Sequence, residues 1–374
     1  MERVIISGGG TGGHIFPAIS IANEIRRRYP KCRILFVGAH GRLEADKVPE
    51  AGYEILLLKI EGLSRGKNPF KHIRTLSLFT RAYYSVKREL KRFRPEVVIG
   101  VGGYASAPTL MVARSLGIPT VVQEQNSYAG VTNKIVGKGA SAVCVAYRGM
   151  EKFFPKAKKV VLTGNPVRAD LLETPKHLPE AYEYFDLSPD NKTLLVLGGS
   201  LGARTINRST ADALAELTSR EDRLQVIWQC GKGYAKEAHR QLREQGYQDR
   251  NVHIHDFISR MDYAYSVADL VISRAGAGSI SEFSLLGLPV ILVPSPNVAE
   301  DHQTKNAQAL AKEGAALMIK DAEAEETLYD VALRVLDAPE ELASLSKQIK
   351  GMALPNAAEK IVDEIELSVR TVKK

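Results

Sequence analysis

Short apolar runs alternate with stretches of helical periodicity along most of this 374-residue chain. In the helical stretches apolar side chains recur three or four positions apart, as Ile19, Ala22 and Ile25 do in the helix predicted over residues 17–29. This alternation is typical of a parallel sheet with helices on both faces. The predicted strands are residues 4–6, 34–37, 55–60, 97–101, 120–123, 142–145, 193–197, 224–229, 252–255, 270–273, 290–293 and 316–319.

The alternation pauses at residues 160–166 and then restarts, which predicts two similar doubly wound α/β domains. We expect an N-terminal domain over residues 1–164 and a C-terminal domain over 165–355. A last helix, within about residues 356–374, is long enough to return to the first domain. Because ligands bind beyond the carboxyl ends of parallel strands, the two domains are expected to face each other across a substrate cleft.

The first predicted strand runs directly into a turn, residues 7–14, that contains five glycines. Such a turn leaves backbone amides accessible and lets an anionic group approach closely. His14 at its end can accept or release a proton near pH 7. The glycines also match the dinucleotide fingerprint, but that fingerprint expects an acidic residue after the second strand, where Ala39 and His40 stand. The turn therefore favours a phosphate or a sugar over nicotinamide or flavin.

Two further glycine clusters follow predicted strands, at residues 102–108 and 198–203. The first indicates either a ligand-contacting loop or an ordinary tight turn with Pro108 at the start of a helix. The second repeats the strand–glycine turn–helix pattern in the C-terminal half. A helix N-terminus there offers unpaired N–H groups to a phosphate, and Ser200 could add a hydroxyl.

The segment 274–282 places another glycine turn between a strand and a helix. Glu282 has two interpretations at this point. Ser279 and Glu282 have the spacing of a capping box, in which the glutamate satisfies a backbone amide. Alternatively, a carboxylate one turn into such a helix is placed to accept from both hydroxyls of a ribose.

Neutral hydrogen-bonding side chains follow several strands. His302, Gln303 and Asn306 open a predicted helix, and they indicate either sugar contacts or a solvated first turn. The polar motif QEQN, residues 123–126, ends another predicted strand and therefore also lies at an open edge of the sheet. Arg168, at the domain junction, could bind a phosphate or form an ordinary interdomain salt bridge.

Some chemistries are disfavoured by the absence of their motifs. No Asp-x-Asp follows a strand, and neither H-E-x-x-H nor G-x-S-x-G occurs. A divalent metal held by paired carboxylates and a serine hydrolase are therefore not expected, and neither is a cofactor. No apolar run is long enough to span a membrane.

The net charge of +8 is concentrated in one segment. Residues 65–94 carry ten Lys or Arg side chains and one carboxylate, Glu89. On a helix over residues 73–92, one side would hold Ile73, Leu76, Thr80, Tyr83, Lys87 and Leu90, and another Arg74, Arg81, Arg88 and Arg92, with Phe70 close by. This pattern suits an anionic membrane surface. A solvated face is the alternative, while nucleic acid lacks any recognition motif here.

Seven motifs, in this order and spread over nearly the whole chain, resemble those of glycosyltransferase family 28. They are GGGTGGHIFPA (8–18), GGYASAP (102–108), QEQN (123–126), TGNPVR (163–168), GGSLGA (198–203), RAGAGSISE (274–282) and residues 302–307. The resemblance implies a GT-B fold, with two Rossmann-like domains, and an inverting, metal-independent transfer. N-acetylglucosamine would move from UDP-N-acetylglucosamine to the muramyl 4-hydroxyl of lipid I, forming lipid II for peptidoglycan. Lipid I is an undecaprenyl-diphosphate-linked muramyl pentapeptide, so the expected location is peripheral, on the cytoplasmic side of the cell membrane.

The resemblance also implies roles for individual residues. His14 is the candidate general base, Glu282 would bind the ribose diol, and the amide of Ile258 would read uracil. The acceptor and membrane side would include Gly103, Tyr104, Phe70, Arg74 and Arg81. The implied donor contacts are Thr11, Gly12, Gly13, Asn126, Arg168, Ser200, Ile258, Ala277, Glu282 and Gln303.

This chain departs from the family pattern at two positions, with His302 where an amide is frequent and Leu201 where glutamine is frequent. Three alternatives share the predicted architecture. They are a UDP-N-acetylglucosamine 2-epimerase, a diacylglycerol glycosyltransferase, and a nucleotide-sugar sensor without catalysis.

Overall fold

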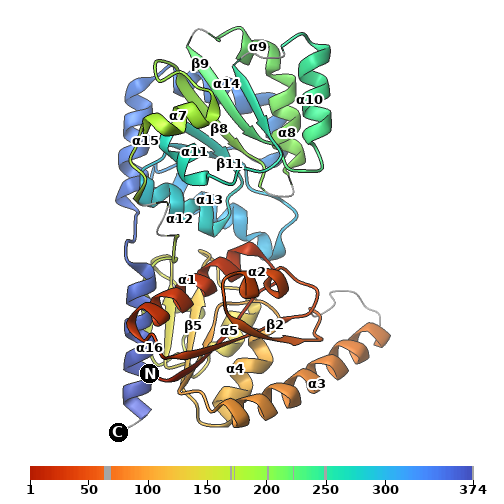
Figure 1. Ribbon diagram of the computed structural model, residues 1–374, viewed down its shortest axis with the longest axis vertical. Coiled ribbons are helices and arrows are strands. Elements are labelled where there is room, and N and C mark those ends of the chain that lie inside the picture. The colour runs from red at the N-terminus through yellow and green to blue at the C-terminus, as the bar shows by residue number, and fades with distance from the viewer. Residues whose placement is uncertain are drawn as a thin grey trace. The chain divides into compact units, whose positions relative to one another are not determined.

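The computed structural model describes residues 1–62, 69–168, 171, 173–199, 202–221, 223–247 and 251–372. The chain forms two compact units: unit 1 comprises Met1–Val167 and Leu354–Lys374, and unit 2 comprises Arg168–Ala353. Each unit contains one parallel sheet with helices packed on it (Figure 1). The predicted pair of doubly wound domains is confirmed, while their arrangement across a cleft stays a prediction.

The sheet of unit 1 has the strand order β3-β2-β1-β4-β5-β6-β7, with every neighbouring pair parallel. Its last strand was not predicted, because three half-buried residues followed by Thr-Gly-Asn-Pro resemble a linker. Val160 nevertheless pairs with Val143 and extends the sheet by one edge strand. The strands are β1 (Arg3–Ser7), β2 (Arg33–Ala39), β3 (Glu54–Leu58), β4 (Val97–Gly100), β5 (Thr120–Glu124), β6 (Ala142–Val145) and β7 (Val160–Leu162).

Helices cover both faces of this sheet. One face packs against α1 (Gly12–Arg28), α2 (Glu44–Glu50) and α16 (Ala357–Val372), and the other against α3 (Pro69–Phe93), α4 (Ser106–Ser115) and α5 (Val131–Val136).

The C-terminal helix α16 belongs to unit 1 and lies beside α1 (Figure 1). Arg28 of α1 donates to Asp363 at 2.6 Å and to Glu366 at 3.0 Å. Ile361 and Ile365 of α16 are fully buried in the core of this unit. Ion pairs and apolar burial together therefore hold the end of the chain on the first domain.

The sheet of unit 2 has the order β10-β9-β8-β11-β12-β13, again parallel throughout. Its strands are β8 (Lys192–Leu197), β9 (Leu224–Gln229), β10 (Val252–His255), β11 (Leu270–Ser273), β12 (Val290–Leu292) and β13 (Leu317–Met318). Its helices are α7 (Pro179–Phe185), α8 (Arg204–Asp212), α9 (Leu214–Thr218), α10 (Ala235–Glu244), α11 (Met261–Val267), α12 (Ala277–Leu286), α13 (His302–Ala311), α14 (Ala324–Leu336) and α15 (Pro339–Gly351).

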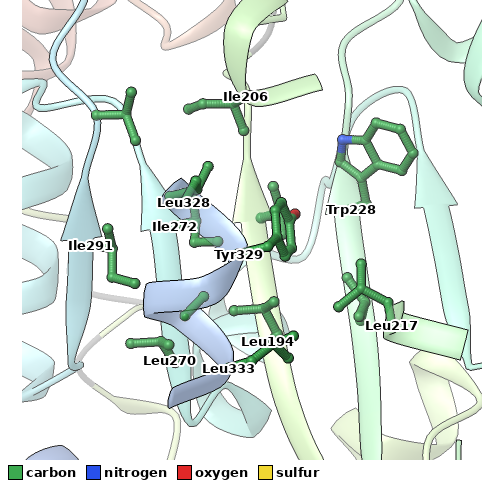
Figure 2. Close-up of a cluster of buried hydrophobic side chains, with 14 of the residues drawn as sticks. Leu194, Ile206, Leu217, Trp228, Leu270, Ile272, Ile291, Leu328, Tyr329 and Leu333 are labelled. Atoms are coloured by element: carbon green, nitrogen blue, oxygen red, sulfur yellow. The ribbon is translucent and has the colours of Figure 1, made fainter. Parts of the chain in front are cut away.

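Large apolar side chains fill the space between this sheet and α14 (Figure 2). Trp228 is fully buried, and its indole Nε1 donates to Asn207 Oδ1 at 3.1 Å. The Tyr329 hydroxyl donates to Thr210 Oγ1 at 2.7 Å. Because each buried aromatic finds a polar partner, this core forms a specific scaffold for the loops at its edge.

In both sheets the strand order reverses at one point, between β1 and β4 in unit 1 and between β8 and β11 in unit 2. Ligands of doubly wound sheets bind outside the carboxyl ends of the strands at this switch point. The four loops that leave these four strands are the glycine-rich segments of the sequence. The fold therefore brings two glycine loops together in each unit.

Candidate active site

The helix α1 begins inside the first glycine run, at Gly12, with Thr11 as its N-cap residue. The sequence predicted a start at Pro17, since glycine disfavours helices. His14 consequently lies in the first turn of the helix. The Thr11 hydroxyl is 3.1 Å from Nδ1 of His14, and this contact orients the imidazole.

The second glycine loop of unit 1 packs directly on the first. Gly102 and Gly103 have φ values of +95° and +87°, which side chains rarely adopt. A Cβ atom on Gly103 would lie 2.4 Å from the Gly9 carbonyl oxygen, and one on Gly102 would lie 2.7 Å from His14 Nε2. Glycine backbone therefore forms the surface against which the histidine ring packs. Tyr104, the next residue, is 47% exposed.

A buried carboxylate organises the loop after β5. Glu124 is 1% exposed and accepts from the backbone amides of Asn126 and Gly130, each at 3.0 Å. The Asn133 side-chain amide donates to it at 2.9 Å. Burial raises the pKa of the Glu124 carboxyl, and these hydrogen bonds oppose that shift. Sequence reasoning singled out Asn126 but missed Glu124, the residue that holds Asn126 in place.

The other members of this motif are structural. Gln123 and Gln125 are buried, and Gln123 Nε2 donates to Asn165 Oδ1 at 2.9 Å. Asn165 Nδ2 in turn donates to the Gln125 carbonyl at 3.0 Å. Asn126 is half-buried, and it is the candidate ligand contact of this segment.

In unit 2, the structure excludes one of the two interpretations of Glu282, and the contact with a ribose stays a prediction. The N-cap of α12 is Gly276, so Ser279 lies inside the first turn and the capping box is wrong. Glu282 Oε2 instead accepts a hydrogen bond from the Tyr265 hydroxyl at 2.7 Å. Tyr265 is 4% exposed, and burial raises its pKa well above the ordinary value, so it stays a donor. The charge of Arg168 opposes that rise, which indicates that Arg168 lies near this pair.

The start of α13 has an unusual backbone. Glu300 and Asp301 both have positive φ, at 56° and 52°, immediately before the helix. The amide of Gln303 is fixed because its Oε1 accepts from the Ser295 N–H at 2.8 Å. Asn306 is fully buried and donates to the Ala275 carbonyl at 3.3 Å, so the alternative of a solvated first turn is wrong at this position, and its sugar contact stays a prediction.

The amide of Ile258, which the resemblance assigns to uracil, has a partner within the protein. Its N–H donates to Gln229 Oε1 at 3.1 Å, and Gln229 is 5% exposed. If uracil accepts a hydrogen bond from this amide, it must either displace the Gln229 side-chain oxygen or share the N–H with it. Phe257, the preceding residue, is 52% exposed.

The remaining loops of unit 2 are shaped by close backbone approaches. Gly202 has a φ of +80°, and a Cβ there would lie 2.6 Å from the Cys230 carbonyl oxygen. Arg274 donates to the Val293 carbonyl at 3.0 Å and pairs with Asp321. Ser200 and Leu201 lie outside the described residues. Ala277, the first residue of α12, is 8% exposed.

The structure thus gathers the predicted residues into separate groups. Unit 1 joins Thr11, Gly12, Gly13, His14 and Gly103 at one switch point. Unit 2 contains Arg168, Ile258, Ala277, Glu282 and Gln303. Among the described residues, no cluster of three or more His, Cys, Asp or Glu side chains is arranged to hold a metal ion.

The outer surface of α3 differs from the prediction. Thr75, Ala82, Val86 and Leu90 face the protein, so the expected common side for Ile73 and Leu90 is wrong. Ala82 and Val86 pack in the core of unit 1, while other apolar residues of the helix face outward. Ile73, Leu76 and Tyr84 are exposed at 66%, 67% and 65%.

Arginine side chains flank these exposed apolar residues on α3. Arg74 and Arg81 are exposed, and Arg74 pairs with Glu61 at 2.6 Å. The side chain of Phe70 lies outside the described residues. In the part of the chain that the structure describes, no helix is both long and apolar enough to cross a membrane.

Two doubly wound parallel sheets in one chain, each with glycine loops at its switch point, define the GT-B class of fold. The family models agree with this class. The N-terminal domain of glycosyltransferase family 28 matches residues 4–145, and the C-terminal domain of the same family matches residues 193–361. The chain therefore belongs to glycosyltransferase family 28.

Relatives extend this assignment over the full length. A protein of Parabacteroides distasonis is 54% identical over 97% of both chains, and it is named UDP-N-acetylglucosamine–N-acetylmuramyl-(pentapeptide) pyrophosphoryl-undecaprenol N-acetylglucosamine transferase. A protein of Porphyromonas gingivalis with the same name is 53% identical over 100% of this chain and 97% of its own.

Solved structures show the same fold. MurG of Acinetobacter baumannii superposes with a TM-score of 0.77 and 31% identity, over 98% of this chain and 99% of its own. The UDP-GlcNAc 2-epimerase of Neisseria meningitidis superposes with a TM-score of 0.69 at 15% identity, over 98% of this chain and 99% of its own. The second likeness concerns the fold alone.

Proposed function

We propose that this enzyme transfers N-acetylglucosamine from UDP-N-acetylglucosamine to the muramyl 4-hydroxyl of lipid I, forming lipid II. The observation that carries the proposal is the identity of 54%, over 97% of both chains, to a relative named for this transfer. The reaction is inverting and needs no metal. Its place is peptidoglycan synthesis at the cytoplasmic side of the cell membrane.

The chemistry is a single displacement at the anomeric carbon. His14 removes the proton from the acceptor hydroxyl as its oxygen bonds to that carbon. The bond from the carbon to the diphosphate oxygen breaks, and UDP leaves with the electron pair. The contact between the Thr11 hydroxyl and Nδ1 supports this role, because it orients the ring for proton transfer at Nε2.

The donor is held mainly by unit 2. Glu282 accepts from the ribose hydroxyls, Gln303 binds the sugar, and the Ile258 backbone binds uracil. The N-terminus of α12 faces the diphosphate, and the positive end of its helix dipole stabilises the negative charge. Thr11, Gly12, Gly13, Asn126, Arg168, Ser200 and Ala277 complete the proposed donor contacts, and Gly103 and Tyr104 contact the acceptor.

The test is an assay of the purified chain with radiolabelled UDP-N-acetylglucosamine and a short-chain lipid I analogue. We expect label in the lipid-linked product, at equal rates with and without EDTA. Failure to label the acceptor would refute the transfer. Loss of labelling in EDTA, restored by a divalent cation, would refute metal independence.

Epimerisation at C2 is the main rival, because the epimerases share the fold. That reaction needs groups free to abstract and return a proton on carbon. In unit 1, the carboxylates nearest the glycine loops, Glu44 and Glu124, are each 1% exposed and bind backbone amides. NMR of the donor incubated alone with enzyme is expected to show no C2 epimer, and its accumulation would favour the rival.

Tyr265 provides a selective test of the donor site. Tyr265→Phe removes one hydrogen bond to a charged group and keeps the ring, which predicts a rise of about tenfold in the donor KM. Turnover at saturating donor should hardly change. Tyr329→Phe is the matched control, because it removes a similarly buried hydroxyl in the core. An unchanged donor KM for Tyr265→Phe would show that this tyrosine does not contribute to donor binding.

The outer surface of α3 suits an anionic membrane, where the lipid-linked acceptor resides. Ile73, Leu76 and Tyr84 offer exposed apolar contact, and Arg74 and Arg81 add positive charge nearby. Basic residues near such a surface contribute about 1 kcal/mol each. This combination favours membrane binding over nucleic-acid binding.

A triple variant tests this surface. Ile73→Ser, Leu76→Ser and Arg81→Glu together are expected to weaken binding to anionic vesicles roughly 30-fold or more. Activity on a water-soluble, short-chain acceptor should remain. The control Tyr184→Ser with Arg243→Glu makes similar changes on unit 2 and should leave vesicle binding unchanged. Equal vesicle affinity of wild type and the triple variant would contradict the proposed surface.

A further inference from the structure

A buried carboxylate lies beneath the first glycine loop. Glu44, the first residue of α2, is 1% exposed. Its Oε2 accepts from the Gly10 N–H at 2.7 Å, and its Oε1 accepts from the Ala39 N–H at 2.9 Å. No Lys or Arg of the described residues forms an ion pair with it. Backbone dipoles of the loops after β1 and β2 therefore stabilise this charge.

The surrounding backbone is built around this side chain. A Cβ atom on Gly9 would lie between 2.2 and 2.5 Å from the Glu44 carboxyl group. One on Gly38 would lie 2.5 Å from Glu44 Cγ. Two positions therefore have to be glycine for Glu44 to fit. Two backbone amides and two glycines therefore form a binding site that fits one carboxylate.

The backbone that binds the Glu44 carboxylate is connected to His14 by direct contacts. Gly10 precedes Thr11, the N-cap residue whose hydroxyl contacts His14 Nδ1. Gly9 lies against Gly103. A shift of the Gly9–Gly10 backbone would therefore move the N-cap of α1 and the support of the imidazole together.

In many glycine turns a ligand's anion binds the exposed amides. We propose that Glu44 is a positioning residue for His14, and that it binds the Gly10 amide in place of a ligand phosphate. The inference rests on the proposed function, because it takes His14 as the base. The Gly10 portion of the loop then accommodates neutral sugar groups, since a second anion beside Glu44 would be repelled.

Glu44→Ala removes the carboxylate from its binding site and leaves room there for acetate. We expect kcat to fall roughly 10²-fold, the size of effect known for misplaced catalytic groups, with a much smaller loss of donor affinity, because unit 2 provides most of the proposed donor contacts. Acetate should restore part of the lost turnover. Acetamide, and chloride at equal ionic strength, should not, because neither supplies a carboxylate to the Gly10 and Ala39 amides.

Glu44→Gln keeps the shape but replaces one acceptor oxygen with a donor, so it should also lose turnover while staying folded. Glu50→Ala changes an exposed glutamate of the same helix and should respond neither in kcat nor to acetate. Wild type assayed in parallel shows whether the transfer itself occurs, which separates failure of this inference from failure of the proposed function. Wild-type turnover in both Glu44 variants, or a loss that acetate leaves unchanged, would overturn the positioning role.

Discussion

Replacement of His14 by alanine is expected to lower kcat about 10²–10⁴-fold, the usual contribution of a general base. Donor affinity should change little, because the role proposed for the imidazole is at the acceptor hydroxyl. Steady-state kinetics with a soluble acceptor, together with calorimetric binding of UDP-N-acetylglucosamine, separate the two effects. The wild-type kcat should also fall as the pH is lowered and the base becomes protonated. That acidic limb should be absent from the variant.

His40→Ala is the matched control for this experiment. His40 is exposed on the loop after β2, in the same unit, and no role in transfer is proposed for it. Its kinetics should equal those of wild type. Unchanged turnover of His14→Ala, or a loss of donor affinity as large as the loss of turnover, would assign the base to another group.

The second large effect is expected at Glu282. If Glu282 accepts from both ribose hydroxyls as proposed, Glu282→Gln weakens two charge-assisted hydrogen bonds, which are worth about 1.5–3 kcal/mol each. The donor KM should rise roughly 10–100-fold or more, with kcat close to wild type. Glu313→Gln neutralises an exposed glutamate after α13 and should leave both constants unchanged.

A donor that lacks the ribose 2′-hydroxyl sharpens this test. Wild type should bind it more weakly than the natural donor, while Glu282→Gln should discriminate much less between the two. If the variant retains full discrimination, Glu282 does not contact the ribose.

Much of the fold could be predicted because its strands are covered on both faces and read as apolar runs. The edge strand β7 was missed since Val160 and its neighbours are half-buried and too few to form such a run. The start of α1 was placed too late because glycines stand in its first turn. On α3, the periodicity indicates apolar residues on more than one side of the helix. Tertiary packing determines which side is buried, and it buries Val86 and leaves Ile73 exposed.

The candidate site was predicted less completely, because its supporting contacts join residues far apart in sequence. Glu44 reaches Gly10 across 34 positions, and Tyr265 reaches Glu282 across 17. No spacing rule connects such pairs. The capping box at Ser279 failed for a local reason, since the helix starts at Ala277 and not one turn later.

The most direct test of the account is the structure of the reaction product. Wild-type enzyme, UDP-N-acetylglucosamine and a lipid I analogue are incubated, and the lipid-linked product is examined by NMR. The account predicts N-acetylglucosamine joined through a β-linkage to the muramyl 4-hydroxyl, inverted from the α-configuration of the donor. An α-linked product, attachment at another hydroxyl, or a C2-epimerised donor with no transfer would contradict it.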